Sequence, residues 1–456
     1  MSQNFPISKL TLALLALPIA SLTHAAGLDR SGQDIKGFFN DGTYAEIDYA
    51  YIKTDISGHD NAANKFGISS KEDYVKGNSS GNMTKDNYTF MRYGVKTDIN
   101  DNLSVGVFYD EPWGAEVEYQ RDSNFIAKKG EDNIISSSLG FGDKSEKVNP
   151  ELNNPNYNKN TEVSVHTESW TGLLGYKADG FQVYGGPVFQ KVKADLNLRG
   201  KAYGPLNGYE ANVNGDSATG WIAGVGYSKP EIALKANLTY RSEIEHKTPI
   251  AEYLPLLASD YSDIVVGQIP GSNSYYKDKI KESGGRATTD TKVTTPESVN
   301  FNLETGLSAK HQLLGTLDVR WVPWEDFSIV PPLYNVVSQA NTQDTTGLPL
   351  IKYREDQWKV DVGLAKRFNE KLAGSVVVGW DSGAGDPTST LGTIDGYYSI
   401  GGGIKYNMTP EWALSLGGKY MKFGDAKGEL PDGSIVSNFE NNDGYVLGAK
   451  LSYQSQ

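Results

Sequence analysis

The sequence has no cysteine among its 456 residues. Disulfide bridges, thiolate metal sites and a cysteine nucleophile are therefore excluded. Basic residues are also few, since 43 Lys and Arg stand against 56 Asp and Glu, and no positive block is present to neutralise the phosphates of a nucleic acid. Hydrophobic residues make up only 38% of the chain, and no apolar run after the first 26 residues is long enough for a membrane-spanning helix.

Glycine and aromatic residues are abundant instead. The chain has 50 Gly, 27 Tyr and 8 Trp, which disfavours intrinsic disorder and favours an all-β protein. Residues 1–25 combine Lys9, the apolar run Leu10–Leu22 and a small-residue cleavage site at Thr23–Ala25, with Ala26 as an alternative end. This pattern predicts a signal peptide and export, because the apolar run is too short to span a bilayer.

Alternating polar and apolar residues predict transmembrane β-strands. In 231–245, for example, Ile232, Leu234 and Leu238 share one face, whereas Lys235 and Asn237 share the other. The same pattern predicts fourteen strands in all: 42–53, 87–97, 103–112, 161–178, 181–198, 216–228, 231–246, 292–309, 312–324, 351–367, 371–381, 395–407, 411–423 and 443–454. Short and long connections alternate between them, and the long external loops include 54–86, 113–160 and 247–291.

This asymmetry predicts an all-β fold, a transmembrane antiparallel β-barrel occupying 42–456, with periplasmic turns at one end. Aromatic residues near the strand ends fit the girdles of such a barrel, whereas a soluble β-sandwich or a propeller explains the one-sided loops less well. Residues 26–41 are too short for a domain, and their apolar residues Ile35, Phe38 and Phe39 favour burial. We therefore expect a plug, or hatch, in the lumen rather than a tail in the periplasm.

The strand 181–198 changes the parity of its apolar residues near Gly185–Pro187, which predicts a bulge, a close backbone approach or a gap in the wall. The predicted inward faces carry ten charges: Asp48, Arg92, Lys191, Lys193, Arg241, Glu243, Asp318, Arg320, Lys359 and Asp361. Most are expected to pair across strands. The cations Lys191, Lys193, Arg241 and Arg320 are candidates to bind an anionic head group. Other inward positions are apolar, as a route for a hydrophobic ligand requires: Phe108, Ile222, Leu314 and Val377.

Three segments resemble the outer-membrane long-chain fatty-acid transporter family of the FadL and TodX type: Tyr109–Tyr119 (YDEPWGAEVEY), Tyr240–Lys247 (YRSEIEHK) and Thr295–Phe327. The resemblance covers nearly the whole mature chain, and its most specific parts are Tyr240–His246 and Arg320–Trp324. It implies fourteen strands, an N-terminal hatch and passive uptake of hydrophobic molecules, which external loops capture and a lumenal pocket holds. Release would follow a hatch movement or a lateral opening at the kink Glu111–Gly114.

The resemblance places a hydrophobic path, together with the apolar lumenal positions above, at Phe38, Phe39, Pro112 and Trp113. Two features depart from the family pattern. No Asn-Pro-Ala stretch follows Ala26, and the terminal aromatic residue read by the assembly machinery would be Tyr453, followed by three more residues.

Enzymatic chemistry is not expected. No nucleophile motif surrounds Ser164 or Ser169 beside His166, and no histidine pair has metal-ligand spacing. We therefore expect no catalytic residue, no metal and no cofactor. Acidic stretches such as Asp260–Asp263 are most simply solvated loop charge.

The sequence thus predicts a Gram-negative outer-membrane channel for long-chain fatty acids or similar hydrophobic compounds. Its expected partners are membrane lipids and lipopolysaccharide, the hydrophobic ligand and the assembly machinery, but no nucleic acid. The alternatives are a porin-like channel for small polar or anionic solutes, an aromatic-hydrocarbon channel, and an adhesin that uses its long loops.

Overall fold

The computed structural model describes residues 28–61, 76–83, 88–127, 154–259, 262–263, 280, 282–342 and 345–455. The expected signal peptide lies outside these residues, as do the first two residues of the expected hatch and parts of the three expected external loops.

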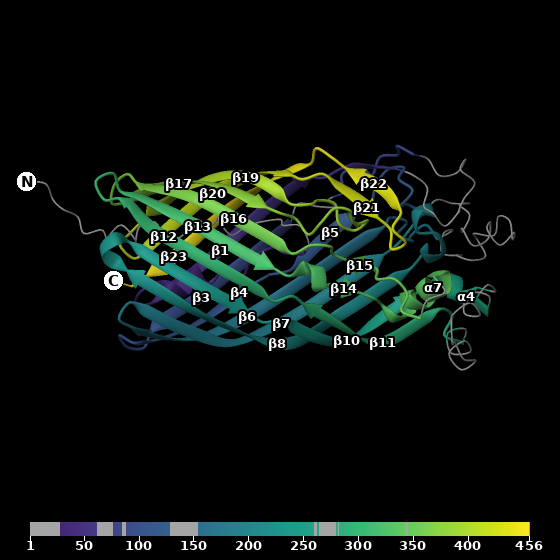
Figure 1. Ribbon diagram of the computed structural model, residues 1–456, viewed down its shortest axis with the longest axis horizontal. Coiled ribbons are helices and arrows are strands. Elements are labelled where there is room, and N and C mark those ends of the chain that lie inside the picture. The colour runs from purple at the N-terminus through teal and green to yellow at the C-terminus, as the bar shows by residue number, and fades with distance from the viewer. Residues whose placement is uncertain are drawn as a thin grey trace, which may run out of the picture.

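Fourteen antiparallel strands form the wall of a closed barrel (Figure 1). Three of them are interrupted, so each of these carries two labels. The wall strands are, in order, β1 (Tyr44–Asp55), β3 (Tyr88–Asp98), β4 (Leu103–Asp110) with β5 (Gly114–Glu118), β6 (Glu162–Ala178), β7 (Phe181–Asn197), β8 (Glu210–Lys229), β9 (Leu234–Arg241) with β10 (Ile244–Tyr253), β11 (Arg286–Thr295) with β12 (Ser298–Ser308), β13 (Leu313–Val322), β16 (Gln357–Arg367), β17 (Leu372–Asp381), β19 (Tyr397–Asn407), β20 (Trp412–Phe423) and β23 (Asp443–Gln454). All fourteen predicted strands are confirmed.

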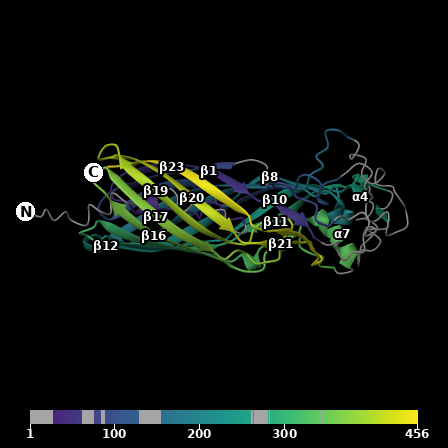
Figure 2. The ribbon, with the colours of Figure 1, turned by 90° about the horizontal axis from the view of Figure 1, so that it is seen from above.

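The barrel closes because β1 pairs with β3 on one side and with β23 on the other, in a register that runs from Tyr44↔Gln454 to Asp55↔Asp443. Closure gives every wall strand a neighbour on both sides. The strands tilt across the barrel, and the long connections gather at the end opposite the C-terminus (Figure 2). The helices α4 (Pro255–Ala258) and α7 (Pro332–Thr342) lie at this loop end, whereas tight turns such as Asp179–Gly180 join the strands at the other.

Smaller elements complete the loop end. They are the two-residue strands β14 (Ser328–Ile329), β15 (Ile351–Lys352) and β18 (Thr388–Ser389), the strands β2 (Gly58–Asp60), β21 (Ala426–Glu429) and β22 (Ile435–Phe439), and the short helices η3 (Lys201–Leu206) and η5 (Trp324–Asp326). β2, β18, β21 and β22 form a four-stranded sheet of their own. The helix η4 (Pro230–Ile232) belongs to a turn at the opposite end.

The outer face of the barrel carries an exposed apolar belt. Aliphatic residues such as Val183, Val225 and Val376 are exposed between two rows of aromatic side chains. One row lies toward the turns and includes Tyr176, Phe181, Tyr406 and Trp412, and the other lies toward the loops and includes Trp170, Trp221, Trp358, Trp380 and Tyr420. Such a belt between aromatic girdles is the lipid-facing surface of a transmembrane barrel.

No helix among the described residues is long and apolar enough to cross a membrane.

The N-terminal segment lies inside the lumen. Its short helix η1 (Lys36–Phe39) buries both phenylalanines, and residues 29–33 are buried throughout. Lys36 forms an ion pair with Asp318 of β13 at 2.8 Å, and Asp34 forms one with Arg92 of β3 at 3.3 Å. The hatch is therefore attached to opposite parts of the wall by ion pairs inside the lumen.

Of the three features predicted for Gly185–Pro187, the structure bears out a close backbone approach and shows neither a bulge nor a gap between β6 and β7. The pairing of β6 with β7 keeps one register through this stretch, although a Cβ on Gly186 would collide with the carbonyl oxygen of Gly172. The register instead shifts between Val192 and Ala194 of β7, opposite the left-handed Gly215 of β8. The apolar residues change parity because β7 leaves the membrane, so that its apolar side turns from the lipid to the lumen.

Candidate functional site

An apolar cavity lies in the loop-side half of the lumen. One side of its lining comes from alternate residues of neighbouring strands: Val163 and Val165 of β6, Val192 and Leu196 of β7, Ala211 and Val213 of β8, Ile250 of β10 and Val293 of β11. The opposite side is formed by residues that include Phe327, Ile351, Tyr353 and Leu391. Such an enclosed, mainly apolar space with few polar groups is typical of a site for a hydrophobic small molecule.

Two tryptophans from distant wall strands meet at this cavity. Trp113 follows the break between β4 and β5, Trp324 follows β13, and their ring centroids lie 5.4 Å apart in an edge-to-face arrangement. Thr167 fixes the Trp113 backbone by accepting a hydrogen bond from its N–H and donating one to its carbonyl, both at 2.8 Å. The Trp324 indole donates to Gln357 at 2.7 Å. The aromatic pair therefore forms a rigid floor of the cavity.

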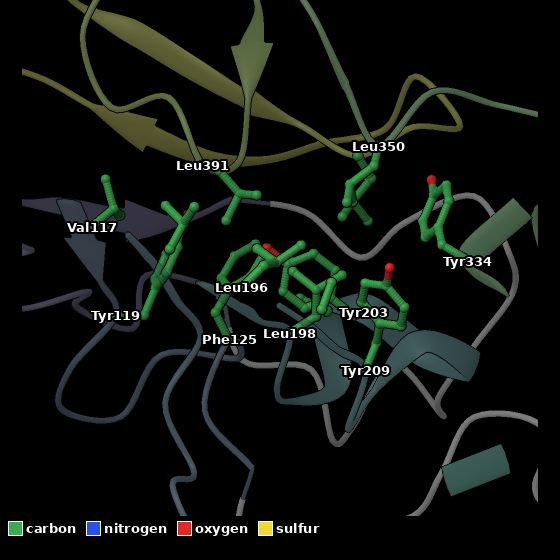
Figure 3. Close-up of a cluster of buried hydrophobic side chains, with 14 of the residues drawn as sticks. Val117, Tyr119, Phe125, Leu196, Leu198, Tyr203, Tyr209, Tyr334, Leu350 and Leu391 are labelled. Carbon is green, nitrogen blue, oxygen red and sulfur yellow. The ribbon is translucent and has the colours of Figure 1, made fainter. Parts of the chain in front are cut away.

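The loop end of the barrel forms a buried aromatic roof (Figure 3). Tyr119 stacks on Phe125 with ring centroids 4.3 Å apart, and the ring of Phe125 meets that of Tyr203 edge to face at 5.2 Å. Tyr209 and Tyr334 extend this cluster toward α7. The cavity is thus covered by side chains from the long connections.

Glu252 attaches α7 to this roof. Its carboxylate accepts hydrogen bonds from the Tyr209 hydroxyl at 2.7 Å and from the backbone N–H groups of Leu333 and Tyr334, in the first turn of α7, at 3.0 and 3.1 Å. Carboxylates are favourable at helix N-termini. Glu252 lies near the loop end of β10, beyond the membrane belt, and burial raises the pKa of its carboxyl.

Four of the residues predicted for the hydrophobic path come together below the floor. Phe38 and Phe39 of η1 pack with Phe108, Ile222 and Tyr184 in one buried cluster. The centroids of Phe39 and Tyr184 are 5.1 Å apart, and those of Phe38 and Phe108 are 6.4 Å apart. Leu314 is not part of this cluster, since it packs with Ala233, Ala365 and Ala373 next to the turns. It therefore lies at a different level of the lumen from the other four residues.

Two of the four predicted head-group cations do not face the lumen. Lys191 and Lys193 alternate with the buried Gln190 and Val192, so their side chains lie on the outer face of β7. Glu243, which was also predicted to face inward, is exposed on the outside. The reason is the same for β7 and for the strand formed by β9 and β10. Above the membrane belt, the apolar side of each strand faces the cavity and the polar side faces water.

Arg320 lies inside the barrel but holds the hatch. Its guanidinium donates to the carboxylate of Asp29 at 2.6 Å, and also to Gln33 and Asn300. Other inward charges pair as predicted: Asp48 with Arg92 at 3.3 Å, and Asp361 with Lys359 and Lys419 at 3.2 and 3.3 Å.

Arg241 is buried in the lumen and is less fully bonded. Within the described part of the chain, its guanidinium makes one hydrogen bond, to the Thr171 hydroxyl at 3.0 Å, and no ion pair. It lies at the upper end of β9, where Ile222 of the hatch cluster and Ser298 are its ladder partners.

The wall has an opening beside Pro112 and Trp113. The ladder between β3 and β4 stops at Tyr93↔Tyr109, and beyond this pair residues 88–92 of β3 have a ladder partner only in β1. The hatch fills the gap, because Arg30 N–H donates to the Pro112 carbonyl at 2.8 Å and Gly114 N–H donates to the Leu28 carbonyl at 2.7 Å. Leu28, Trp113 and Gly114 also line the cavity.

Sequence reasoning missed several residues of this site. Asp29 and Arg30 occur in a hatch whose contacts are all non-local, and Glu252 falls in the predicted external loop 247–291, where it looks like any solvated loop residue. The sequence did point to Trp324, since this residue ends Arg320–Trp324, one of the most specific segments of the family resemblance. Among the described residues, no three His, Asp or Glu side chains come together as a metal site.

No family model matches the sequence, and no curated protein matches it closely enough to be recognised. Solved structures do match. A Pseudomonas aeruginosa FadL homologue aligns with 97% of this chain and 99% of its own at a TM-score of 0.62 and 13% identity. The fold is that of this FadL homologue. The toluene transporters TodX of Pseudomonas putida and TbuX of Ralstonia pickettii each align with 96% of this chain and 97% of their own, at a TM-score of 0.51 and 11% and 10% identity.

The FadL-type fold and the belt together define the location. Only closed barrels and helices satisfy backbone hydrogen bonds within a bilayer, and even-numbered antiparallel barrels of this kind are built in bacterial outer membranes. The protein is an outer-membrane β-barrel of the Gram-negative type.

Proposed function

We propose that this protein is a channel for the passive uptake of hydrophobic compounds, and that long-chain fatty acids are its ligands. The apolar cavity between the Trp113–Trp324 floor and the loop roof is the observation that carries this proposal. A water-filled pore for polar solutes does not need such a lining, whereas a hydrocarbon chain gains roughly 0.8 kcal/mol for each CH₂ group that it buries.

The route out of the cavity runs through the wall. The hatch and its phenylalanines lie across the lumen below the floor, whereas the gap between β3 and β5 begins at cavity-lining residues. Among the described residues, the backbone of Leu28–Arg30 fills this gap and makes two hydrogen bonds to its edge. A shift of this short segment opens a lateral exit toward the membrane, which suits a ligand that avoids water.

Arg241 is the residue that we assign to the ligand carboxylate. Of the two predicted cations that face the lumen, Arg241 and Arg320, it is the less fully bonded, and charge-assisted hydrogen bonds to a carboxylate would complete its bonding. The neighbours TodX and TbuX are named as toluene transporters, so a neutral aromatic hydrocarbon is the alternative ligand.

Filling the cavity tests the proposal. Val213→Trp places a large side chain at a buried cavity position of β8, and Val225→Trp, on the same strand, places one at a position that is 51% exposed on the lipid face. We expect the first variant to lose uptake of labelled oleate into proteoliposomes, and the second to keep it. Equal uptake by both variants would show that the cavity is not the ligand site.

Conductance distinguishes the proposed channel from a porin. Because the hatch lies across the lumen, the purified protein should show no large steady current in a planar bilayer. Steady open-channel currents that oleate does not affect would overturn the proposed function.

A further inference from the structure

A second part of the wall has no backbone ladder, between β8 and β10. Below it, β8 pairs with β9 from Lys229↔Leu234 to Ile222↔Arg241. Above it, β8 pairs with β10 at only three positions, from Ala251↔Asn212 to Tyr253↔Glu210. Trp221 and Ser242 still exchange hydrogen bonds at 3.0 Å. The strands then run from 213 to 220 and from 243 to 250, all described by the structure, with no ladder pair between them. We call this stretch the β8–β10 seam.

An extra residue at each end explains the seam. On β8, the register shifts at Gly215, which has a φ of 92°. Where β9 gives way to β10, both Arg241 and Ser242 are buried, and from there the inward residues change from odd numbers to even ones. Ile222 and Arg241 face inward as partners, whereas Gly220 lies against Ile244. The two strands are thus offset by one residue inside the seam, so the register of the ladders below and above does not continue through it.

Side chains hold the seam closed from the lumen. His246 of β10 is fully buried, and its Nδ1 lies 3.5 Å from the carboxylate of Asp216 on β8. Its Nε2 lies 3.1 Å from Oε1 of Gln190, which also accepts a hydrogen bond from Thr295 at 2.7 Å. The contact between His246 and Asp216 crosses the seam where the backbone does not.

The seam connects two environments. On its inner side, Val213, His246, Thr248 and Ile250 line the apolar cavity. Its outer side starts directly above Trp221 and Tyr240, whose rings pack 5.1 Å apart in the loop-side aromatic row. Above this row the exposed residues are charged or polar, among them Glu243, Glu245 and Lys247. The seam therefore opens at the level where the head groups of the outer leaflet meet water.

We propose that the β8–β10 seam is a second lateral portal, through which single-chain amphiphiles pass between the outer leaflet and the cavity. The contact between His246 and Asp216 is its latch. A seam of about eight residues per strand is roughly 26 Å long, so that, once open, it would let an extended acyl chain enter sideways. Opening it separates side chains but breaks no ladder, whereas any paired part of the wall would leave buried backbone groups unsatisfied. This inference rests on the proposed function, since it requires an amphiphile in the cavity.

Hydrogen exchange tests whether the seam is weak. In the purified full-length protein in nanodiscs, we expect the amides of 243–250 that point toward β8 to exchange much faster than those of 235–241 in β9, which has ladders on both sides. Equal protection of the two segments would overturn the proposal.

Cross-linking tests whether cargo uses the seam. Because the chain has no cysteine, Ser217→Cys with Lys247→Cys can be joined across the seam by a short bis-maleimide. The matched control joins Lys191→Cys with Ser217→Cys, which are ladder partners in β7 and β8. We expect linking across the seam to slow the uptake of a fluorescent fatty acid severalfold, and the control link to leave it unchanged. If the unlinked protein takes up the fatty acid and both links leave its rate the same, the portal is refuted while the proposed function stands. If the unlinked protein takes up none, the proposed function fails as well.

Weakening the contact between His246 and Asp216 tests whether it keeps the seam closed. Asp216→Asn keeps the size of the side chain but removes its charge, so we expect uptake to become severalfold faster. Asp443→Asn, which is exposed on β23, is the control and should leave the rate unchanged. An unchanged or slower rate in Asp216→Asn would contradict a latch at this position.

Discussion

Arg320 and Asp29 lie 291 residues apart in the chain and meet inside the barrel, with Nε and Oδ2 separated by 2.6 Å. Both side chains are almost fully buried, and the guanidinium also reaches Gln33 and the carbonyl oxygen of Gly32. The wall strand β13 thus holds the hatch through a buried ion pair and the hydrogen bonds around it. The hatch stays in place because of this contact as much as because of its phenylalanines.

Removing one partner of this pair should release the hatch. Asp29→Asn leaves the Arg320 charge buried without its partner, which costs about 3–5 kcal/mol for a buried ion pair. We expect residues 28–34 to become accessible to protease, and current fluctuations to appear in planar bilayers. The double variant with Arg320→Gln should recover part of the protection. A hatch that remains as resistant in Asp29→Asn as in the wild type would show that other contacts hold it.

Arg241 offers a test of ligand class. Arg241→Gln keeps a hydrogen-bond donor but removes the charge, and hydrogen bonds to charged groups contribute about 1.5–3 kcal/mol. The affinity for oleate should therefore fall by roughly one to two orders of magnitude, whereas that for toluene should not change. Quenching of tryptophan fluorescence on titration measures both, because Trp113 and Trp324 line the cavity. Equal losses of affinity for oleate and toluene would mean that Arg241 maintains the shape of the cavity rather than binding a carboxylate.

Glu252 makes the attachment of α7 depend on pH. Burial raises the pKa of this carboxyl above its value in the unfolded chain, so its contribution to stability is fully present below the unfolded pKa of about 4.3 and is lost as pH rises through the folded value. We expect α7 amides, corrected for intrinsic exchange, to open more readily as pH rises from about 4.3. Glu252→Gln should make this opening independent of pH. An opening that varies with pH equally in both proteins would assign the effect to another group.

Gly186 should not tolerate a side chain. A Cβ there would collide with the Gly172 carbonyl oxygen, whereas a Cβ on Gly172 would meet only Pro187, at 3.7 Å. Gly186→Ala should therefore destabilise the barrel by about 1–3 kcal/mol, as overpacking does, and Gly172→Ala should be nearly neutral. Heat-modifiability on gels and denaturant midpoints measure the difference. Equal stability of the two variants would show that β6 and β7 separate easily.

The sequence could predict the features that depend on a local residue pattern, but not those that depend on contacts between distant residues. Alternation along each strand predicted the wall, because the side-chain period of a strand needs no knowledge of its partners. The same alternation does not say which face meets lipid and which meets the lumen. Lys191 and Lys193 were therefore assigned to the wrong face, since above the belt the cavity takes the apolar side.

The site depends on contacts that no local pattern contains. The apolar character of η1 predicted a plug, but its anchor on Arg320 joins two distant parts of the chain. Leu314 met the same apolar criterion as Ile222, although they lie at different levels of the lumen. The seam arises from two single-residue shifts, which become visible only when β8 and β10 are placed side by side.

The pairing of β1 with β23 also determines the order of assembly. The strand made first and the strand made last are neighbours, so the sheet can only close after the whole chain has been exported. Since the hatch makes its contacts within the closed wall, it has to fold inward before or while the two edges meet. A chain that ends before Asp443 would leave β1 and β20 as open edges, ready to pair with any other strand nearby.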